Sequence, residues 1–115
     1  MTNQQVFDKV LEHSRHMTEK CEIEIEGRKK CMYRGKDGNK CFVGALIPDE
    51  IYNPSIEEHD AENAIDILFL HDKFQDHNLL DALQIIHDSK FDNREEELMK
   101  LASEWNLTYT PPTQN

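Results

Sequence analysis

The sequence predicts an α+β domain in which a small antiparallel sheet of about three strands, including a β-hairpin, packs against about four helices. Three observations predict this class: four segments with apolar residues at helical spacing, one segment that alternates apolar and acidic residues, and an Asp-Gly turn signal between two short apolar runs. A chain of 115 residues is one domain by length. We assign residues 1–107 to that domain and residues 108–115, which contain Pro111-Pro112, to a flexible C-terminal tail.

The first helix is expected over residues 4–16, where Val6, Phe7, Val10 and Leu11 share one face. Thr2 or Asn3 is placed to cap it, with Gln5 completing a capping box from Thr2. The helix should end near Met17.

Two elements of the sheet follow. Residues 21–27 alternate apolar and acidic side chains, as a half-buried edge strand requires, and Gly27 ends the strand. Residues 31–34 and 40–43 flank Asp37-Gly38 and predict a hairpin. A three-residue loop would place Tyr33 opposite Cys41 and Cys31 opposite Val43, whereas a two-residue loop would shift that register.

The second half of the chain is expected to be helical. A helix should start at Ser55, which forms a capping box with Glu58, and end near His71. Its apolar stripe is formed by Ala61, Ala64, Ile65, Leu68 and Phe69. Asn78 is placed to cap a third helix, and Asp92 or Asn93 a fourth. The buried face of the third helix is formed by Leu79, Leu80, Leu83, Ile86 and His87, and that of the fourth by Leu98, Leu101, Ala102 and Trp105.

The formal net charge of −10 argues against binding of nucleic acid or an anionic membrane through the overall field of the protein. No apolar run approaches the roughly 20 residues of a transmembrane helix, and the polar N-terminal segment lacks the hydrophobic stretch of a signal peptide. We therefore expect a cytoplasmic protein whose three cysteines are thiols.

Two charged patches are candidate binding surfaces. The first is basic and follows the expected hairpin, where Tyr33, Arg34 and Lys36 lie beside the turn. Its alternative explanation is a solvated edge strand protected by lysines. The second is acidic and can imitate the phosphates of a duplex, or can simply complement the N-terminus of a helix. Its residues are Glu57, Glu58, Asp60, Glu62 and Asp66.

Metal binding is a further possibility, in which Cys31, Cys41 and His87 hold zinc. The spacing is not one of the short ligand pairs, and packing of the thiols as small hydrophobic groups is the alternative. The pairs His59-Asp60, His71-Asp72 and His87-Asp88 also occur in metal-dependent phosphohydrolases, but this chain is short for such a site. Capping or packing explains these imidazoles as well. No nucleophile has an assignable base, so we expect no enzyme.

The run Cys31-Met32-Tyr33-Arg34-Gly35 is followed by Gly38, Cys41, Gly44 and Leu46-Ile47-Pro48-Asp49, and later by Leu83-Gln84-Ile85-Ile86-His87-Asp88. This pattern resembles a set of small uncharacterised proteins of bacteriophages and bacteria. The resemblance implies a shared fold and a phage or prophage setting, hence the host cytoplasm, and carries no catalytic residue with it.

We expect a non-enzymatic, phage-type accessory protein without a cofactor that binds and modulates a host macromolecule, most simply a host protein. Such a protein would act as a host-takeover or anti-defence inhibitor, with acidic mimicry as one route. The alternative is a small-ligand or zinc-binding module built on the Cys31 and Cys41 hairpin. The oligomeric state stays open, because an edge strand such as Ile23–Ile25 can pair with a second copy.

Overall fold

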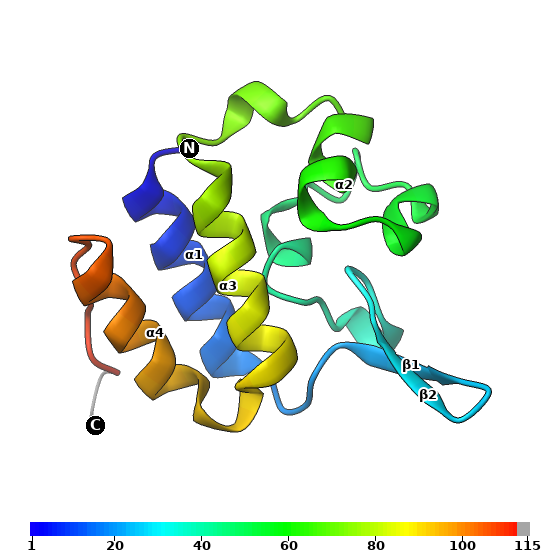
Figure 1. Ribbon diagram of the computed structural model, residues 1–115, viewed down its shortest axis with the longest axis horizontal. Coiled ribbons are helices and arrows are strands. Elements are labelled where there is room, and N and C mark those ends of the chain that lie inside the picture. Colours follow the sequence, from blue (N-terminus) through cyan, green and yellow to red (C-terminus); the bar gives the residue numbers. More distant parts are fainter. Residues whose placement is uncertain (113–115) are drawn as a thin grey trace.

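The computed structural model describes residues 1–112 and shows an α+β fold (Figure 1). The helices are α1 (Asn3–His16), α2 (Ala61–Ile67), α3 (His77–Ser89) and α4 (Arg94–Glu104), and the strands are β1 (Glu22–Ile25) and β2 (Arg28–Cys31). Short 3-10 turns at Lys36–Gly38, Gly44–Leu46, Pro54–Glu58, His71–Lys73 and Phe91–Asn93 complete the order. The predicted class and the four helices are confirmed, but the sheet within residues 1–112 has two strands rather than about three.

The helices α1, α3 and α4 lie together on one side of the molecule, α2 lies on the other side of α3, and the hairpin of β1 and β2 projects from the body (Figure 1). Contacts join α1 to α4, α3 to α4 and α2 to α3. The radius of gyration, 13.8 Å, is close to the value expected for a compact chain of this length. None of the helices in residues 1–112 combines the length and the apolar character that crossing a bilayer requires.

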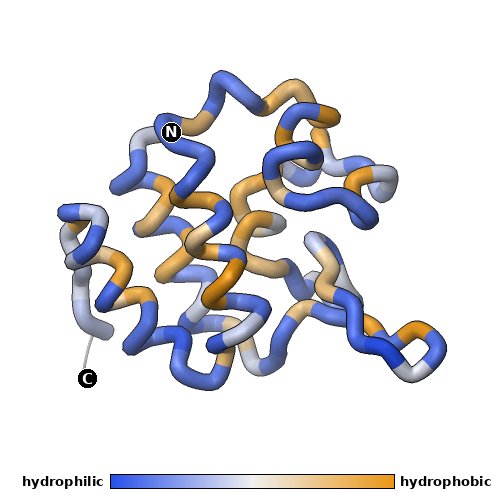
Figure 2. The backbone as a smooth tube through the Cα atoms, in the orientation of Figure 1, coloured by the Kyte–Doolittle hydropathy of each residue, from blue (hydrophilic) through white to orange (hydrophobic). Residues whose placement is uncertain are grey.

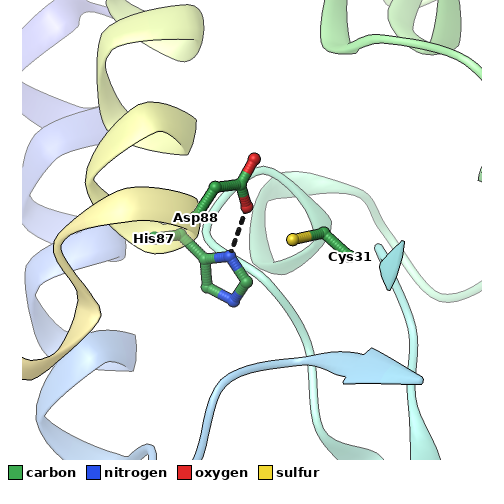
Figure 3. A group of neighbouring side chains, drawn as sticks. All are labelled: Cys31, His87 and Asp88. Atoms are coloured by element: carbon green, nitrogen blue, oxygen red, sulfur yellow. Dashed lines mark hydrogen bonds and ion pairs between the residues drawn. The ribbon is translucent and has the colours of Figure 1, made fainter. Parts of the chain in front are cut away.

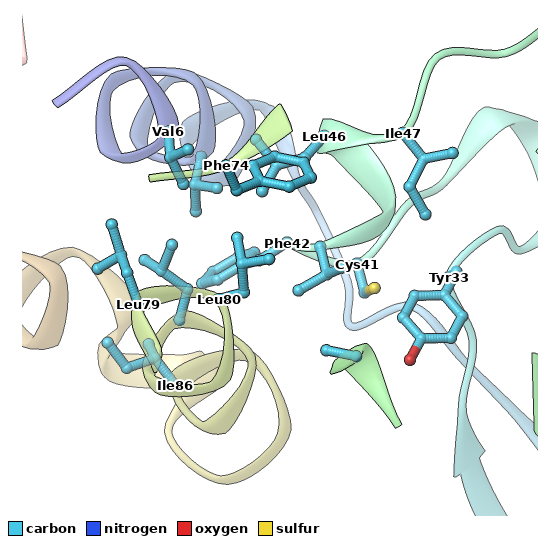
Figure 4. Packing of buried hydrophobic residues seen from close by; sticks show 14 of the residues in the cluster. Val6, Tyr33, Cys41, Phe42, Leu46, Ile47, Phe74, Leu79, Leu80 and Ile86 are labelled. Carbon is cyan, nitrogen blue, oxygen red and sulfur yellow. The ribbon is translucent and has the colours of Figure 1, made fainter. Parts of the chain in front are cut away.

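One hydrophobic core joins the helices to the irregular segment 41–47. Phe42 and Val43 of that segment are fully buried, as are Phe7 of α1 and Leu80 of α3. Figure 4 shows Phe42 pointing toward α3, with Cys41 and Tyr33 at the far edge of the cluster. Along the tube in Figure 2, hydrophobic residues recur at intervals in the helices, whereas much of the chain between them is hydrophilic. Segment 41–47 therefore fills the centre of the core although it contains no strand.

The N-terminal helix begins as the sequence predicts. The Thr2 side chain accepts a hydrogen bond from the Gln5 backbone N–H, and the Gln5 side chain accepts one from the Thr2 backbone N–H. This reciprocal pair satisfies two of the donors that the first turn of a helix leaves free.

The hairpin lies earlier in the chain than the Asp-Gly signal suggested. The predicted strand at 21–27 is β1, but its partner is β2, and the turn between them is Glu26-Gly27, with φ of 52° and 79°. A two-residue turn with both φ values positive matches the twist of a hairpin. Glu24 lies opposite Lys29 in the register, and the Lys29 ammonium forms an ion pair with Glu22 of β1 at 3.7 Å. This complementarity stabilises a pairing of two polar segments that hydrophobic alternation does not reveal.

The predicted hairpin between residues 31–34 and 40–43 is reduced to a single antiparallel bridge between Arg34 and Lys40. The register is that of the three-residue loop, since the Cys41 backbone N–H donates to the Tyr33 carbonyl at 3.3 Å. The pairing does not extend to Cys31 and Val43, because the chain turns into the 3-10 turn at Gly44. A Cβ atom on Gly44 would lie 2.0 Å from the Tyr33 carbonyl oxygen, so only glycine permits this close approach.

The segment from Ser55 to His71 is not one continuous helix. The Asn53 side chain accepts from the Ser55 backbone N–H and begins a 3-10 turn in place of the expected Ser55 capping box. The chain is extended at His59, and the Asp60 side chain then accepts from the Asn63 N–H to start α2. The side chains of Asn53 and Asp60 therefore cap the two helical segments, in place of the predicted capping box of Ser55 and Glu58.

The third and fourth helices follow the prediction closely. Asp76, rather than Asn78, caps α3, and Asn93 precedes α4. Beyond α4, the Thr108 backbone N–H donates to Gln4, the Thr110 carbonyl accepts from Arg15, and Tyr109 donates to Glu95. The start of the expected tail thus contacts α1 and α4, while residues 113–115 lie outside the described residues.

Candidate functional site

An open cleft lies between the C-terminal half of α3, the end of β2 and the start of α2. Its cavity has a volume of about 270 Å³. The carboxylates of Glu57, Asp60, Asp81 and Asp88 line it together with the thiol of Cys31, and none of its described lining residues is Lys or Arg. We call this cavity the acidic cleft. A concave surface with several carboxylates and no lysine or arginine suits a cationic group.

Glu57 has a structural role in the wall of the cleft. Its carboxylate accepts hydrogen bonds from the backbone N–H groups of Tyr33, at 2.8 Å, and Arg34, at 3.2 Å. It also accepts one from the Tyr52 hydroxyl. Burial, followed by this hydrogen bond, raises the pKa of Tyr52 to about 12. Glu57 therefore ties segment 33–34 to the 3-10 turn at Pro54–Glu58.

Tyr33 and Arg34 are occupied within the fold. Tyr33 is 7% exposed, its hydroxyl donates to the His59 carbonyl at 2.7 Å, and burial raises its pKa. The Arg34 guanidinium donates to Asp49 at 2.7 Å and to the Ile47 carbonyl, and it lies 4.9 Å above the Tyr52 ring. Both side chains fix the path of the chain around the cleft, and little of either reaches solvent.

Lys36 is exposed and lies away from the acidic cleft. The basic patch around it is largely neutralised by ion pairs inside the chain: Lys29 with Glu22 at 3.7 Å, Lys30 with Glu58 at 3.9 Å and Lys40 with Asp49 at 3.3 Å. Such pairing is typical of a protected, solvated hairpin and leaves little charge to cradle a phosphate.

The exposed carboxylates of the second patch gather around α2. We call Glu58, Asp60, Glu62 and Asp66 the acidic face, and all four are exposed. Asp60 caps α2, Glu58 is paired with Lys30, and Asp66 lies 3.1 Å from the His71 imidazole. The sequence has no Lys or Arg between Lys40 and Lys73. The acidic face therefore continues the negative potential of the acidic cleft onto the surface.

Cys31, His87 and Asp88 meet at the inner wall of the cleft, with donor atoms within 4.8 Å of one another. Figure 3 shows the Cys31 sulfur directed toward the pair formed by the other two residues. His87 is fully buried; its Nε2 accepts from the Cys21 backbone N–H at 3.1 Å, and its Nδ1 donates to Asp88 at 2.8 Å. A backbone N–H always donates, so the imidazole is the neutral tautomer with its proton on Nδ1.

The hydrogen bonds of His87 compete with metal binding at this donor set. Both nitrogens of His87 are engaged, and a metal on either one would leave the Cys21 N–H or the Asp88 carboxylate without its partner. Burial and the neighbouring Asp88 raise the pKa of the Cys31 thiol to about 12 in the metal-free chain, and zinc, which binds the thiolate, would have to displace this proton. Cys41 lies outside the cluster, and its sulfur accepts from the Gly44 N–H at 3.2 Å. The structure thus unites Cys31 with His87 but not with Cys41.

Asp88 and Asp81 are residues of the cleft that the sequence did not single out as binding residues. The signal for Asp88 was its place in the His87-Asp88 pair, and the signal for Asp81 was its spacing of seven residues, two helical turns, from Asp88. His59 and Asp60 line the same cavity as Asp88, whereas His71 and Asp72 are not among its lining residues. Among residues 1–112, only Cys31, His87 and Asp88 form a group of three potential metal ligands.

No known protein family, curated protein or solved structure matches this chain.

Proposed function

We propose that this chain is a non-enzymatic accessory protein that binds and modulates a host macromolecule, and that it docks on a basic protein surface through its acidic face and acidic cleft. The observation that carries the proposal is the continuity of these two features. The four exposed carboxylates around α2 and the four that line the cavity share Asp60, and two of the lining carboxylates, Asp81 and Asp88, come from α3. Complementary potentials of this kind steer association and select partners.

The chemistry of the thiols supports a binding role over a catalytic one. A cysteine nucleophile acts as the thiolate, which needs a lowered pKa. Burial instead raises the pKa of Cys21 to about 11, and burial with Asp88 raises that of Cys31 to about 12. The imidazole of His87 donates from Nδ1 to Asp88 and accepts at Nε2 from the Cys21 N–H, so neither ring nitrogen is free to act as a base for the thiols. The proposal includes the host cytoplasm as the location of the protein, a compartment in which thiols stay reduced.

The test compares two variants that remove equal charge from different faces. The acidic-face variant carries Glu58→Gln, Asp60→Asn, Glu62→Gln and Asp66→Asn, and the asparagine introduced by Asp60→Asn keeps a side-chain oxygen that can cap α2. The control variant carries Asp8→Asn, Glu12→Gln, Glu96→Gln and Glu104→Gln on α1 and α4, where all four residues are solvent-accessible. Each tagged protein is used for capture from nuclease-treated host lysate, read by mass spectrometry.

A partner enriched by the native protein and the control variant, and lost with the acidic-face variant, supports the proposal. A partner retained equally by all three proteins would contradict the proposal, because binding would then not depend on the carboxylates of the acidic face.

The zinc-binding alternative draws on one observation, the meeting of Cys31 with His87. Elemental analysis of protein purified without added metal tests it directly. Zinc near one per chain, with loss of stability on chelation, would replace the proposal above; its absence, with stability unchanged by chelation, leaves the hydrogen-bonded cluster as the role of these residues.

A further inference from the structure

Phe69 combines two unfavourable features at one position. Its side chain is 90% exposed, the largest exposure among the large hydrophobic residues described. Its backbone has φ of 58°, in the left-handed region that side chains with a Cβ disfavour. Exposed apolar area and a left-handed aromatic residue both work against folding, and neither is offset by burial of the ring.

The backbone at Phe69 ends α2 in a Schellman motif. The Phe69 N–H donates to the Asp66 carbonyl at 3.0 Å and the Leu70 N–H to the Ile65 carbonyl at 2.9 Å. The position between these bonds is the one that glycine usually occupies, with asparagine next. A glycine would complete the same hydrogen bonds without the strain.

The same motif at the end of α4 has the usual chemistry. There the Leu107 N–H donates to the Ala102 carbonyl at 2.8 Å, and the left-handed residue is Asn106, with φ of 55°. The chain thus uses asparagine where the motif only ends a helix. At α2 it places an exposed phenyl ring at the corresponding position.

The surroundings of Phe69 specify the charge of what covers it. Ile67 beside it is 40% exposed, and Asp66 and Glu62 of the acidic face lie on the helix that it ends. Asp72 and Lys73 follow and are both exposed, so the four charged side chains comprise three carboxylates and one ammonium. An aromatic anchor with an acidic surround is complementary to an apolar pocket with a basic rim.

Two other occupants are disfavoured by this charge. In a symmetric pair of copies the same patch faces itself, so the carboxylates around each Phe69 would be brought together. An anionic membrane surface would repel them as well.

We propose that Phe69 is the anchor of the partner interface and that it inserts into an apolar pocket rimmed by lysine or arginine on a protein. This inference rests on the proposed function. It adds an apolar contact residue to the charged residues of the acidic face. The strain and exposure of Phe69 in the free protein are the cost of presenting an anchor already ordered for binding.

The test uses a displayed library of random peptides selected on the native protein. Phe69→Gly and Phe69→Asn both suit the left-handed backbone, so their folds are retained and their urea midpoints are equal to or above that of the native protein. Met99→Asn on α4, a residue 46% exposed, is the matched control at the opposite side of the molecule from α2 (Figure 1).

Selected peptides should combine a large apolar residue with Lys or Arg, and their affinity should fall about tenfold or more with either Phe69 variant and stay unchanged with Met99→Asn. Peptides that bind all variants equally, or that carry no basic residues, would overturn the proposal. So would a lower urea midpoint for Phe69→Gly, which would make Phe69 a stabilising residue.

Two controls separate the other occupants, and the acidic-face variant separates this inference from the proposed function. Self-association in sedimentation, or flotation with phosphatidylserine vesicles, that depends on Phe69 would replace the protein partner. If the selected peptides lose affinity with the acidic-face variant but keep it with Phe69→Gly, the anchor is wrong and the proposed function stands. If they lose it with Phe69→Gly alone, the anchor stands without a basic rim and the acidic-face function is wrong.

Discussion

The backbone N–H of Cys21 donates to Nε2 of His87, a residue 66 positions further along the chain, at 3.1 Å. This bond joins the segment that enters β1 to the C-terminal half of α3, and it fixes the tautomer of an imidazole that is fully buried. The edges of Phe42 and Phe91 pack around the same ring, with centroids at 5.4 and 5.6 Å. His87 is therefore a polar member of the core.

Replacement of His87 by alanine should lower the free energy of unfolding by about 3 kcal/mol, because it leaves the Cys21 N–H unsatisfied and opens a cavity. Urea unfolding measures this loss. His16→Ala, at an exposed imidazole paired only with Glu12, is the control and should change stability by less than about 0.5 kcal/mol. A His87→Ala protein as stable as the control would show that the buried bond is not formed in solution.

Neighbouring glutamates should respond differently to the same substitution. Glu57→Ala removes the acceptor of two backbone N–H groups and a tyrosine hydroxyl, so we expect a loss of about 2–3 kcal/mol in unfolding free energy. Glu58→Ala removes one exposed ion pair at 3.9 Å and should cost less than about 0.5 kcal/mol. Equal losses in urea unfolding would contradict the structural role of Glu57.

Stability should decline at alkaline pH. Burial raises the pKa of Cys21 to about 11, of Cys31 to about 12 and of Cys41 further, whereas an unfolded thiol titrates near a pKa of about 8.5. The unfolded chain therefore loses these protons first as the pH rises. The stabilisation is complete below about pH 8.5 and is lost progressively above it.

Urea midpoints between about pH 7 and 10 measure this decline. Cys31→Ser removes one titrating thiol, so its midpoint should fall less steeply with pH than that of the native protein. Parallel slopes for the two proteins would mean that the Cys31 thiol titrates as freely in the folded protein as in the unfolded chain.

The helices were predictable because local signals and burial agree in them. The Thr2 and Gln5 capping box starts α1, and Leu79, Leu80 and Leu83 form the buried stripe of α3 as their spacing predicts. The hairpin was placed wrongly because β2 is polar and its recorded ion pair to β1, between Lys29 and Glu22, leaves no hydrophobic alternation to recognise, and because the turn uses Glu26, a residue with no marked turn preference.

The candidate site was less accessible to sequence reasoning. The acidic residues around α2 were identified, but their place beside a cavity depends on how α2 packs against α3. The roles of Tyr33 and Arg34 depend on contacts with residues 13 to 26 positions away, to His59 and Ile47. Phe69 lies outside the core because α2 ends at Ile67. The sequence did not indicate this end, because apolar residues recur at helical spacing without interruption from residue 61 to residue 69.

The most direct test of the account is the affinity of the purified partner for the native protein, the acidic-face variant and the control variant at two salt concentrations. The account predicts that native binding weakens as salt rises, and that the acidic-face variant binds more weakly and with a shallower salt dependence, while the control variant follows the native protein. Equal affinities and equal salt dependence for all three proteins would contradict docking through the acidic face.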